Sequence, residues 1–372
     1  MSNSNVKAVV GLQLGDENKT QILDLLAKDV DIVIKYQNGN NSERVNNEYG
    51  SFDLAIVPSS AFNPDLMSII SAGSFVELEK LDKEMEEVKN KTCLDLESLF
   101  IDERAYILMP YHLGAISELK KDIASGVALQ CGDLLDEERL GRKILDIAES
   151  KDVAFSTLKD TCYKWRATFG NNIIDTLPVV RDSFQSECPM LVDAGDSTLN
   201  DALWGASSDN QNSSTLPNAL YSIGLPPNST ECVYGVARAY TKKNSNAIIS
   251  TKMSEDATDG WFDAVAVDHA AYINGVTNIA LMDISALDTL DSIKVCIGYS
   301  IMGEYYATFP QTRLLENAKP IYADFEGWKE DTSSITSWDS LPEKCKRYIL
   351  ELEKFLNLPI SIVETKNNLI FR

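Results

Sequence analysis

The sequence predicts an α/β protein whose central sheet is covered by helices on both faces. The first observation is that apolar strand-like runs and amphipathic helix-like runs alternate along the 372 residues, a pattern typical of this fold class. The second is the turn at residues 11–21, GLQLGDENKTQ, which joins an apolar run to a helix-like run as phosphate-binding turns do. No repeat or linker interrupts the alternation, so we expect a single domain over residues 1–372.

The predicted strands are short apolar runs, and the predicted helices have apolar residues at helical spacing. The strands cover residues 6–11, 31–36, 53–58, 105–110, 189–195, 230–240, 278–284 and 292–301. The helices cover residues 20–29, 65–73, 141–150, 261–275 and 343–356. The last helix carries a start signal, because Ser340 can cap it, Glu343 can reach back to the cap, and Pro342 suits the first turn.

The composition excludes several classes of function. With 56 acidic and 34 basic residues the formal charge is −22, so binding to DNA, RNA or an anionic membrane would work against the net field. The amino terminus lacks the regions of a signal peptide, and no apolar stretch is long enough to cross a bilayer. We therefore expect a cytoplasmic protein that binds neither nucleic acid nor membrane.

The cysteines and histidines do not predict a zinc site. The seven cysteines are scattered singly, and the chain has only two histidines, His112 and His269. Cysteine and neutral histidine are the usual ligands of zinc, so we expect reduced cysteines and no ordinary zinc centre. His112 follows a predicted strand and His269 lies in a predicted helix, and for both we expect a packing role rather than a catalytic one.

Several stretches together resemble the adenylosuccinate synthetase family, whose members use GTP to join IMP and aspartate. Residues 9–26, VVGLQLGDENKTQILDLL, are similar to the family's VVGxQWGDEGKGKIVDLL, and residues 32–45 are similar to VVxRxQGGNNAGHTV. The similarity continues through LMPYH, GDLLDEERL, VYGVARAYT and GWFDAVAVDHAAYINGVTNIAL to the tail that begins YADFEGWKED. The resemblance implies a large, mostly parallel sheet flanked by helices, GTP and Mg²⁺ as cofactors, and a homodimer.

The resemblance assigns roles to the first loop, residues 11–20. Asp16 stands where the family has its general base and is also implied as a metal contact, and Lys19 stands where the family neutralises phosphate charge. Gly15 is kept, but Asn18 and Thr20 replace two glycines. Asn tolerates a positive φ better than other non-glycine residues, so Asn18 can hold the turn, whereas the β-branched Thr20 occupies space that a phosphate would need. Gly15, Asn18 and Thr20 are implied nucleotide-binding positions.

The second loop keeps two asparagines and loses the family's catalytic acid. Asn40 and Asn41 are implied nucleotide-binding residues, although Asn is common in turns in any case. Glu43 and Arg44 stand where the family has a Gly-His pair whose imidazole is the general acid. An arginine stays protonated at biological pH and cannot exchange that proton, but it can clamp a phosphate. We predict an anion clamp for Arg44, with an ordinary surface arginine as the alternative.

The remaining sub-sites implied by the resemblance are also changed. Residues 113–131 are too short to hold the family's purine-phosphate loop, and Gly126 falls near the arginine donated across the dimer. Gly195 replaces a glutamine that touches the nucleotide. Acidic residues replace the arginines that hold aspartate and the lysine of the guanine-reading motif, and serine replaces the aspartate of that motif; the residues are Glu255, Asp256, Asp283 and Ser285.

These changes predict a member of the family that has lost IMP–aspartate ligation and serves as a scaffold, a regulator or a nucleotide-binding protein. The alternative is a diverged purine-nucleotide ligase or phosphotransferase that uses Asp16 and Lys19 on another substrate. Both residues are also compatible with a role in starting the first helix. For partners we expect a homodimer, or a heteromer with an active synthetase.

Overall fold

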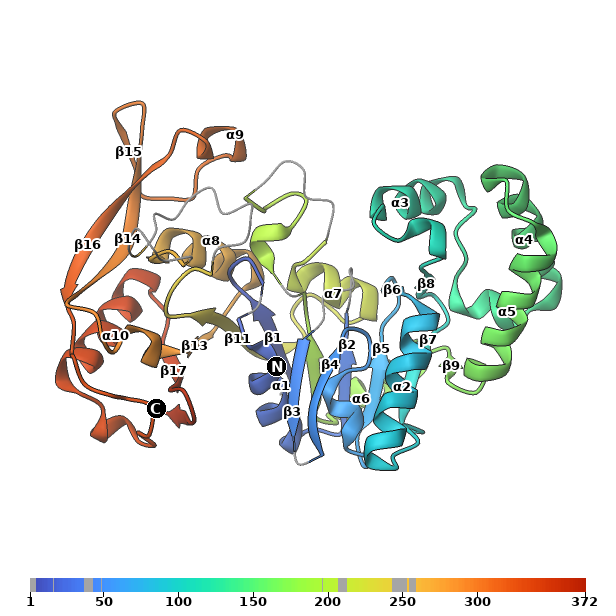
Figure 1. Cartoon of the computed structure of the whole chain (residues 1–372), viewed down its shortest axis with the longest axis horizontal. Helices are drawn as coiled ribbons and strands as arrows, with labels where there is room; N and C mark the ends of the chain where they lie inside the picture. The colour runs from blue at the N-terminus through green and yellow to red at the C-terminus, as the bar shows by residue number, and fades with distance from the viewer. Residues whose placement is uncertain are drawn as a thin grey trace. The chain divides into compact units, whose positions relative to one another are not determined.

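The computed structural model describes residues 5–15, 17–36, 43–47, 49–195, 197–206, 213–242, 253 and 259–372, and of Glu43 only the backbone. The predicted positions Asp16, Asn40 and Asn41 therefore lie outside the described residues, as do Glu255 and Asp256. Figure 1 shows the helices and strands. In the part of the chain that is described, no helix is long and apolar enough to cross a membrane.

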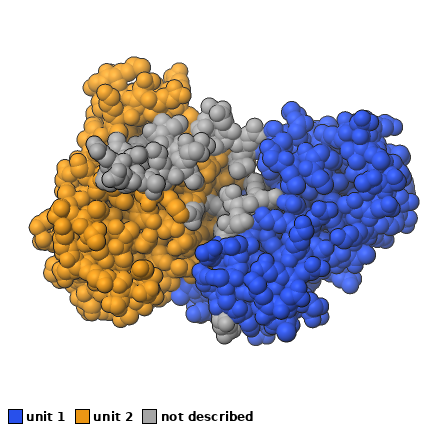
Figure 2. All heavy atoms as spheres, viewed as in Figure 1, with its two compact units in different colours: residues 1–6, 23–193, 218–231 blue, residues 7–22, 194–217, 232–372 orange. Residues whose placement is uncertain are grey.

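The protein has the predicted α/β fold. Among the described residues, the central sheet has ten strands and is mostly parallel. The chain divides into two compact units, shown in two colours in Figure 2. Unit 1 comprises Met1–Val6, Leu23–Asp193 and Asn218–Glu231, and unit 2 comprises Lys7–Ile22, Ala194–Pro217 and Cys232–Arg372. The single domain predicted from the sequence stays a prediction.

Unit 1 contains five parallel strands of the central sheet, two small two-stranded sheets and most of the helices of the first half. The central strands, in spatial order, are β10 (Met190–Asp193), β2 (Ile32–Lys35), β5 (Met67–Ile70), β7 (Leu99–Asp102) and β9 (Ile173–Ile174). The small sheets are β3 (Glu43–Asn47) with β4 (Gly50–Leu54), and β6 (Phe75–Val76) with β8 (Tyr106–Ile107). The helices are α2 (Leu78–Thr92), α3 (Ile116–Ser125), α4 (Glu137–Lys151), α5 (Phe155–Phe169) and α6 (Leu177–Gln185), with the 3-10 turns η1 (Ala27–Asp29), η2 (Ser59–Phe62), η3 (Pro110–His112) and η4 (Cys131–Leu135).

The core of unit 1 follows from its sequence. Strand β2 is buried along its whole length, as expected for a parallel strand covered on both faces. Helices α4 and α5 lie side by side (Figure 1), and their buried side chains, Leu140, Ile144, Leu158 and Trp165 among them, join the main cluster. The amphipathic spacing of these side chains is what turns one stripe of each helix towards the core.

Residues 65–73 were predicted as a helix, and this prediction is wrong. The structure places strand β5 there, parallel to β2 on one side and to β7 on the other. A short apolar run has no periodicity that separates a buried strand from a buried helix. The β-branched Ile69 and Ile70, both fully buried, favour the strand because they pack well on a pleated surface.

Unit 2 contains the other five strands of the central sheet and a second sheet of four strands. The central strands are β18 (Leu369–Phe371), β17 (Ile360–Glu364), β13 (Asn278–Met282), β11 (Thr230–Arg238) and β1 (Val6–Gly11). The second sheet has β12 (Phe262–Asp263), β14 (Ser292–Ile301), β15 (Glu304–Tyr306) and β16 (Lys319–Glu326). The helices are α1 (Lys19–Leu26), α8 (Ala264–Asn274), α9 (Thr312–Leu315) and α10 (Glu343–Leu356), with η5 (Thr198–Asn200), η6 (Ile284–Leu287) and η7 (Trp338–Ser340). Helix α7 (Leu216–Ile223) lies mostly in unit 1, and the division into units falls within β1, α1, α7 and β11.

The predicted cap of the last helix is also wrong. Helix α10 begins at Glu343, and Pro342 is its N-cap without a side-chain hydrogen bond. Ser340 is the last residue of η7, and its hydroxyl pairs with the Ser337 hydroxyl at 2.8 Å. The serine therefore lies too early in the chain to accept from the first turn of the helix. Glu343 instead pairs with Lys346 at 2.8 Å.

Candidate functional site

The first loop, residues 11–20, leaves strand β1 and enters helix α1. Its start is fixed by backbone hydrogen bonds from Leu12 to Val236 (3.0 Å) and from Gly11 to Gly195 (3.4 Å). Gly15 has a φ of 99° and Asn18 a φ of 61°. The prediction that asparagine holds the left-handed turn is thus confirmed, because Asn is among the few side chains that tolerate this conformation.

The side chain of Gln13 joins the loop to the carboxyl end of strand β11. Its Nε2 donates to the carbonyls of Arg238 (3.3 Å) and Tyr240 (3.0 Å), and its Oε1 accepts from the Arg238 amide (2.9 Å). The Ser197 hydroxyl donates to the Gln13 carbonyl. Gln13 is 4% exposed, so a buried amide group is fully satisfied by these contacts.

The carboxylate of Glu17 folds back over the turn. Its Oε1 accepts from the backbone amides of Gln13 (3.1 Å) and Gly15 (2.8 Å), and Glu17 is 2% exposed. Hydrogen bonds to a buried carboxylate are stronger than those between neutral groups. Two amides of the turn are therefore engaged by the protein's own anion rather than pointing to an open site.

Lys19 and Thr20 are the first residues of α1, and both are buried. Lys19 is 4% exposed and its Nζ donates to the Gly195 carbonyl at 3.4 Å, while Thr20 is 6% exposed. At Gly195 an added Cβ would lie 2.5 Å from the Ser214 carbonyl oxygen. The backbone therefore leaves no room here for the glutamine that the family resemblance implies.

A polar network connects the end of the first loop to the carboxyl ends of β11 and β13. Arg238 Nη2 donates to Asn18 Oδ1 (3.1 Å), and Arg238 Nη1 lies 3.4 Å from Asp283 Oδ2. Tyr240 Oη donates to the same Asp283 oxygen at 2.9 Å. The Asp283 amide donates to Glu364 Oε2 at 3.0 Å. The carboxyl ends of neighbouring parallel strands are where α/β proteins bind ligands, so this edge of unit 2 is the candidate site.

Burial sets the acid–base properties of this network. It raises the pKa of the Glu364 carboxyl, against the lowering effect of the hydrogen bond from the Asp283 amide. It also raises the pKa of Tyr240, whose hydroxyl lies between the opposing charges of Arg238 and Asp283. Tyr240 is therefore a neutral hydrogen-bond donor at physiological pH. Sequence reasoning missed Arg238, because the residues around it in the chain do not show which side chains it contacts.

Ser285, the other changed residue of the motif that contains Asp283, is part of a structural link. Its hydroxyl pairs with Thr332 Oγ1 at 2.8 Å and accepts from the Lys366 amide at 3.1 Å. Asp288 accepts from Trp328 Nε1 and from the Thr332 amide, both at 2.7 Å. These contacts fix η6 and the residue after it to the segment between β16 and η7 and to the turn between β17 and β18.

Arg44 lies on the exposed hairpin of β3 and β4 in unit 1. Its Nε is 3.2 Å from Asp53 Oδ1, directly across the hairpin, and the two side chains are 68% and 67% exposed. Such exposed pairs contribute little to stability because solvent screens them. The anion clamp predicted for Arg44 stays a prediction.

Residues 113–131 contain helix α3 in place of a loop. Leu119 packs with Phe75, Leu108 and Ala128 in a small cluster of its own. Gly126 ends the helix with a φ of 78°. The region that the resemblance assigns to a purine phosphate is thus occupied by a packed helix.

His112 is a structural residue, as predicted. Its Nε2 is 2.9 Å from Asp122 Oδ2 on α3, and its Nδ1 accepts from the Met109 amide at 3.2 Å. Lys151, at the end of α4, pairs with the other Asp122 oxygen at 2.7 Å. Burial lowers the pKa of His112, against the raising effect of Asp122. The neutral ring therefore holds η3 to α3, while the Asp122–Lys151 pair joins α3 to α4.

His269 is packed rather than placed for catalysis, again as predicted. Its ring stacks on Phe309 with centroids 4.6 Å apart, and its Nε2 is 2.9 Å from the Trp204 carbonyl oxygen.

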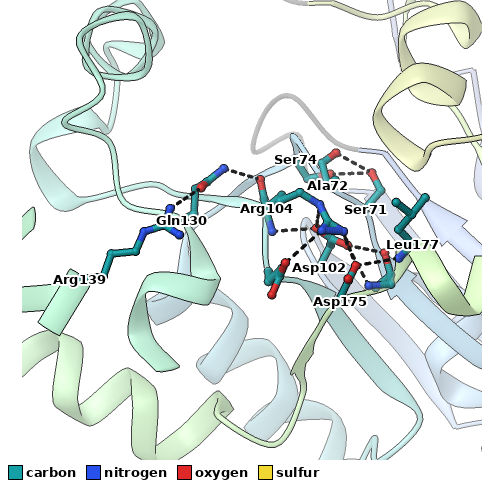
Figure 3. Close-up of polar contacts among 11 residues, drawn as sticks. Ser71, Ala72, Ser74, Asp102, Arg104, Gln130, Arg139, Asp175 and Leu177 are labelled. Atoms are coloured by element: carbon teal, nitrogen blue, oxygen red, sulfur yellow. Dashed lines mark hydrogen bonds and ion pairs between the residues drawn. The ribbon is translucent and has the colours of Figure 1, made fainter. Parts of the chain in front are cut away.

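A second polar cluster lies at the carboxyl end of β7 in unit 1 (Figure 3). The guanidinium of Arg104 contacts Asp102 (3.3 Å), Glu103 (3.0 Å) and Asp175. Asp102 also accepts from the Thr176 amide at 3.1 Å. The arginine is thus bonded to three carboxylates, so the cluster fixes the turn after β7 to the start of α6 and is not an open anion site. Sequence reasoning did not single it out.

No metal centre is present among the described side chains, where no group of three or more His, Cys, Asp or Glu residues is placed to hold an ion. The metal contact implied for Asp16 lies outside these residues. The fold and the first loop define an α/β protein with a phosphate-loop-like turn at the carboxyl edge of a parallel sheet.

Comparisons with known proteins identify the family. The family model described as adenylosuccinate synthetase matches residues 8–259 and 256–368, and the chain therefore belongs to the adenylosuccinate synthetase family. An adenylosuccinate synthetase of Caldicellulosiruptor bescii is 29% identical over 413 residues, with 97% of each chain covered. Another, of Methanosarcina acetivorans, is 27% identical and covers 96% of this chain and 97% of the relative.

Solved structures share the fold. The fully ligated adenylosuccinate synthetase of Plasmodium falciparum has a TM-score of 0.87 at 22% identity and covers 99% of this chain and 100% of its own. The succinoaminodeoxyadenylate synthetase of cyanophage S-2L, bound to dGMP and dATP, has a TM-score of 0.53 at 12% identity, with 97% of this chain and 92% of that chain covered. At these identities the similarity concerns the fold alone.

Proposed function

We propose that this protein is a member of the adenylosuccinate synthetase family that has lost IMP–aspartate ligation and keeps the fold as a scaffold for a partner or a nucleotide. The observation that carries the proposal is the state of the first loop. Its lysine, Lys19, is 4% exposed and donates to the Gly195 carbonyl. Its turn amides donate to Glu17, and its Asn18 side chain accepts from Arg238.

The free energy of binding and catalysis that the changed sub-sites are expected to lose supports this proposal. The resemblance implies five changed sub-sites: the phosphate glycines, the catalytic acid, the purine-phosphate loop, the aspartate arginines and the guanine carboxylate. Each change removes hydrogen bonds or charge complementarity of about 1 to 4 kcal/mol. Losses that affect different steps compound, so ordinary adenylosuccinate synthesis is absent or very slow.

One observation favours a second candidate, a diverged purine-nucleotide ligase or phosphotransferase. The turn has kept its left-handed residues at Gly15 and Asn18, so its backbone path does not need the lost glycine. Such an enzyme would use the retained Asp16 and Lys19, and by resemblance GTP and Mg²⁺, on a different substrate or nucleotide.

The test is a thermal-shift titration of the purified protein with GTP, ATP, dATP, GDP, IMP, GMP and aspartate, each with and without Mg²⁺. A ligand that binds only the folded state raises the melting temperature with its concentration. For a scaffold that binds a partner we expect no Mg²⁺-dependent shift with any triphosphate at millimolar concentration. A clear Mg²⁺-dependent shift would favour the diverged ligase instead.

For partners we propose a homodimer, or a heteromer in which the protein binds and regulates an active synthetase. The family match over residues 8–259 and 256–368 supports this, because the resemblance to the family implies a homodimer. Size-exclusion chromatography with light scattering, alone and with an active synthetase, tests both forms. A monomer under both conditions would contradict the proposal.

A further inference from the structure

Arg238 is a buried cation at the carboxyl end of strand β11, where it contacts the end of the first loop. Its side chain is 8% exposed, and its Nη2 is 3.1 Å from Asn18 Oδ1, in the turn that leads into α1. Its position is fixed from the backbone side, because Gln13 Oε1 accepts from the Arg238 amide at 2.9 Å. An arginine held in this way is suited to bind a phosphate, since the planar guanidinium can donate two parallel hydrogen bonds to it.

Asp283 supplies the counter-charge to this arginine from within the chain. Its Oδ2 lies 3.4 Å from Arg238 Nη1 and accepts from Tyr240 Oη at 2.9 Å. Its backbone is fixed as well, because its amide donates to Glu364 Oε2 at 3.0 Å and its φ is 57°. Both the backbone and the side chain of Asp283 are therefore held in place, while 29% of the side chain stays exposed.

We propose that Asp283, the residue that follows strand β13, is specificity-determining: it neutralises Arg238 beside the first loop and so excludes ligands that carry a phosphate group. A phosphate approaching Arg238 meets a carboxylate that already satisfies part of the guanidinium and repels the incoming charge. The inference rests on the proposed function in the form in which the scaffold serves a partner, because it gives a reason for a loop with a phosphate-binding shape to bind no nucleotide. It assigns the exclusion of phosphate to the Asp283 side chain rather than to the two glycines that Asn18 and Thr20 replace.

The test replaces Asp283 by asparagine. Asn keeps the left-handed backbone conformation and can still accept from Tyr240, so we expect Asp283→Asn to fold. The probe is inorganic tripolyphosphate, measured by isothermal titration calorimetry at low and high salt. We expect the variant to bind at least about tenfold more tightly than the unmodified protein, corresponding to about 1.4 kcal/mol, with a gain that falls as salt screens the charges.

Two further variants make the result specific. Asp291→Asn removes one negative charge at a side chain that is 92% exposed and pairs with Lys329, so it controls for net charge alone. The double variant Arg238→Gln/Asp283→Asn removes the cation as well and should lose the gain. The proposal is overturned if Asp283→Asn binds no more tightly than Asp291→Asn, or if the double variant binds as tightly as Asp283→Asn.

The result that would contradict the proposed function differs from the result that would contradict the role of Asp283. If the unmodified protein forms adenylosuccinate, the proposed loss of ligation is wrong whatever the binding data give. If it forms none and Asp283→Asn shows no gain, only the role assigned to Asp283 is wrong.

Discussion

At the scale of single residues, the first loop is held by contacts that need no ligand. Asn18 combines a left-handed backbone with a side-chain oxygen that accepts from Arg238. A glycine at this position would give the backbone freedom but no such anchor. Glu17 satisfies turn amides on the other side. The replacement of one glycine has thus been accompanied by a new contact that stabilises the turn.

Gly195, whose carbonyl accepts from Lys19 of the first loop, provides a direct test of how tightly the backbone packs beside this loop. An added Cβ would lie 2.5 Å from the Ser214 carbonyl oxygen, and we expect Gly195→Ala to lower the free energy of unfolding by about 3 kcal/mol. The matched control is Gly141→Ala in helix α4, where an added Cβ meets nothing within 4 Å. Alanine should stabilise that helix by about 0.5 to 1 kcal/mol. Urea denaturation measures both, and equal effects of the two substitutions would contradict the packing argument.

The sequence predicted single residues unevenly. The left-handed Asn18 and the structural roles of His112 and His269 followed from the properties of one residue and its neighbours in the chain. Arg238 was missed because its partners, Asn18 and Asp283, are far from it in sequence. A contact of that kind depends on which strands lie beside each other, and local pattern does not contain this information.

At the scale of elements, helix α8 begins at a buried carboxylate. Asp263 is its N-cap and accepts from the Ala266 amide at 3.0 Å and from Tyr299 Oη at 2.7 Å. Burial raises the pKa of the Asp263 carboxyl to about 6, although these hydrogen bonds lower it. In the unfolded chain its pKa is about 3.9. The folded state therefore binds a proton between these two values that the unfolded state does not.

This shift predicts how stability depends on pH. The protonated Asp263 carboxyl stabilises the folded state, and this stabilisation is fully present below pH about 4 and is lost as the pH rises through about 6. The free energy of unfolding therefore changes by on the order of 3 kcal/mol across this range. Asn does not titrate, so Asp263→Asn should gain stability relative to the unmodified protein as the pH rises from 4 to 7. Denaturant unfolding of both proteins across this range measures the difference. A difference that stays constant with pH would contradict the assigned shift.

The elements also show where sequence patterns reach their limit. Long amphipathic helices such as α4 and α10 were predicted because several turns of apolar spacing leave little ambiguity. Strand β5 was predicted as a helix because a short run with three apolar residues, Met67, Ile69 and Ile70, fits either structure. Helix α3 was not predicted. Much of its packing is with a small cluster contributed by β6, β8 and the segment after the helix, and these contacts cannot be read from the helix's own sequence.

At the scale of the whole molecule, the family's fold is kept over nearly the full chain while its implied site residues have changed. The family model matches residues 8–259 and 256–368, and the matched relatives are covered almost from end to end. The core positions that build the sheet therefore suffice for the fold at below 30% identity. The chemistry of a site depends on a few side chains and can be lost while the core is preserved.

The measurement that tests the central claim most directly is a ligation assay. The purified protein is incubated with IMP, GTP, Mg²⁺ and aspartate, and adenylosuccinate, GDP and phosphate are quantified by chromatography. The Caldicellulosiruptor bescii relative, assayed in parallel, shows that the conditions support the reaction. We expect adenylosuccinate at the level of the protein-free blank. Formation of adenylosuccinate at a rate close to that of the relative would contradict the loss of ligation and with it the proposed function.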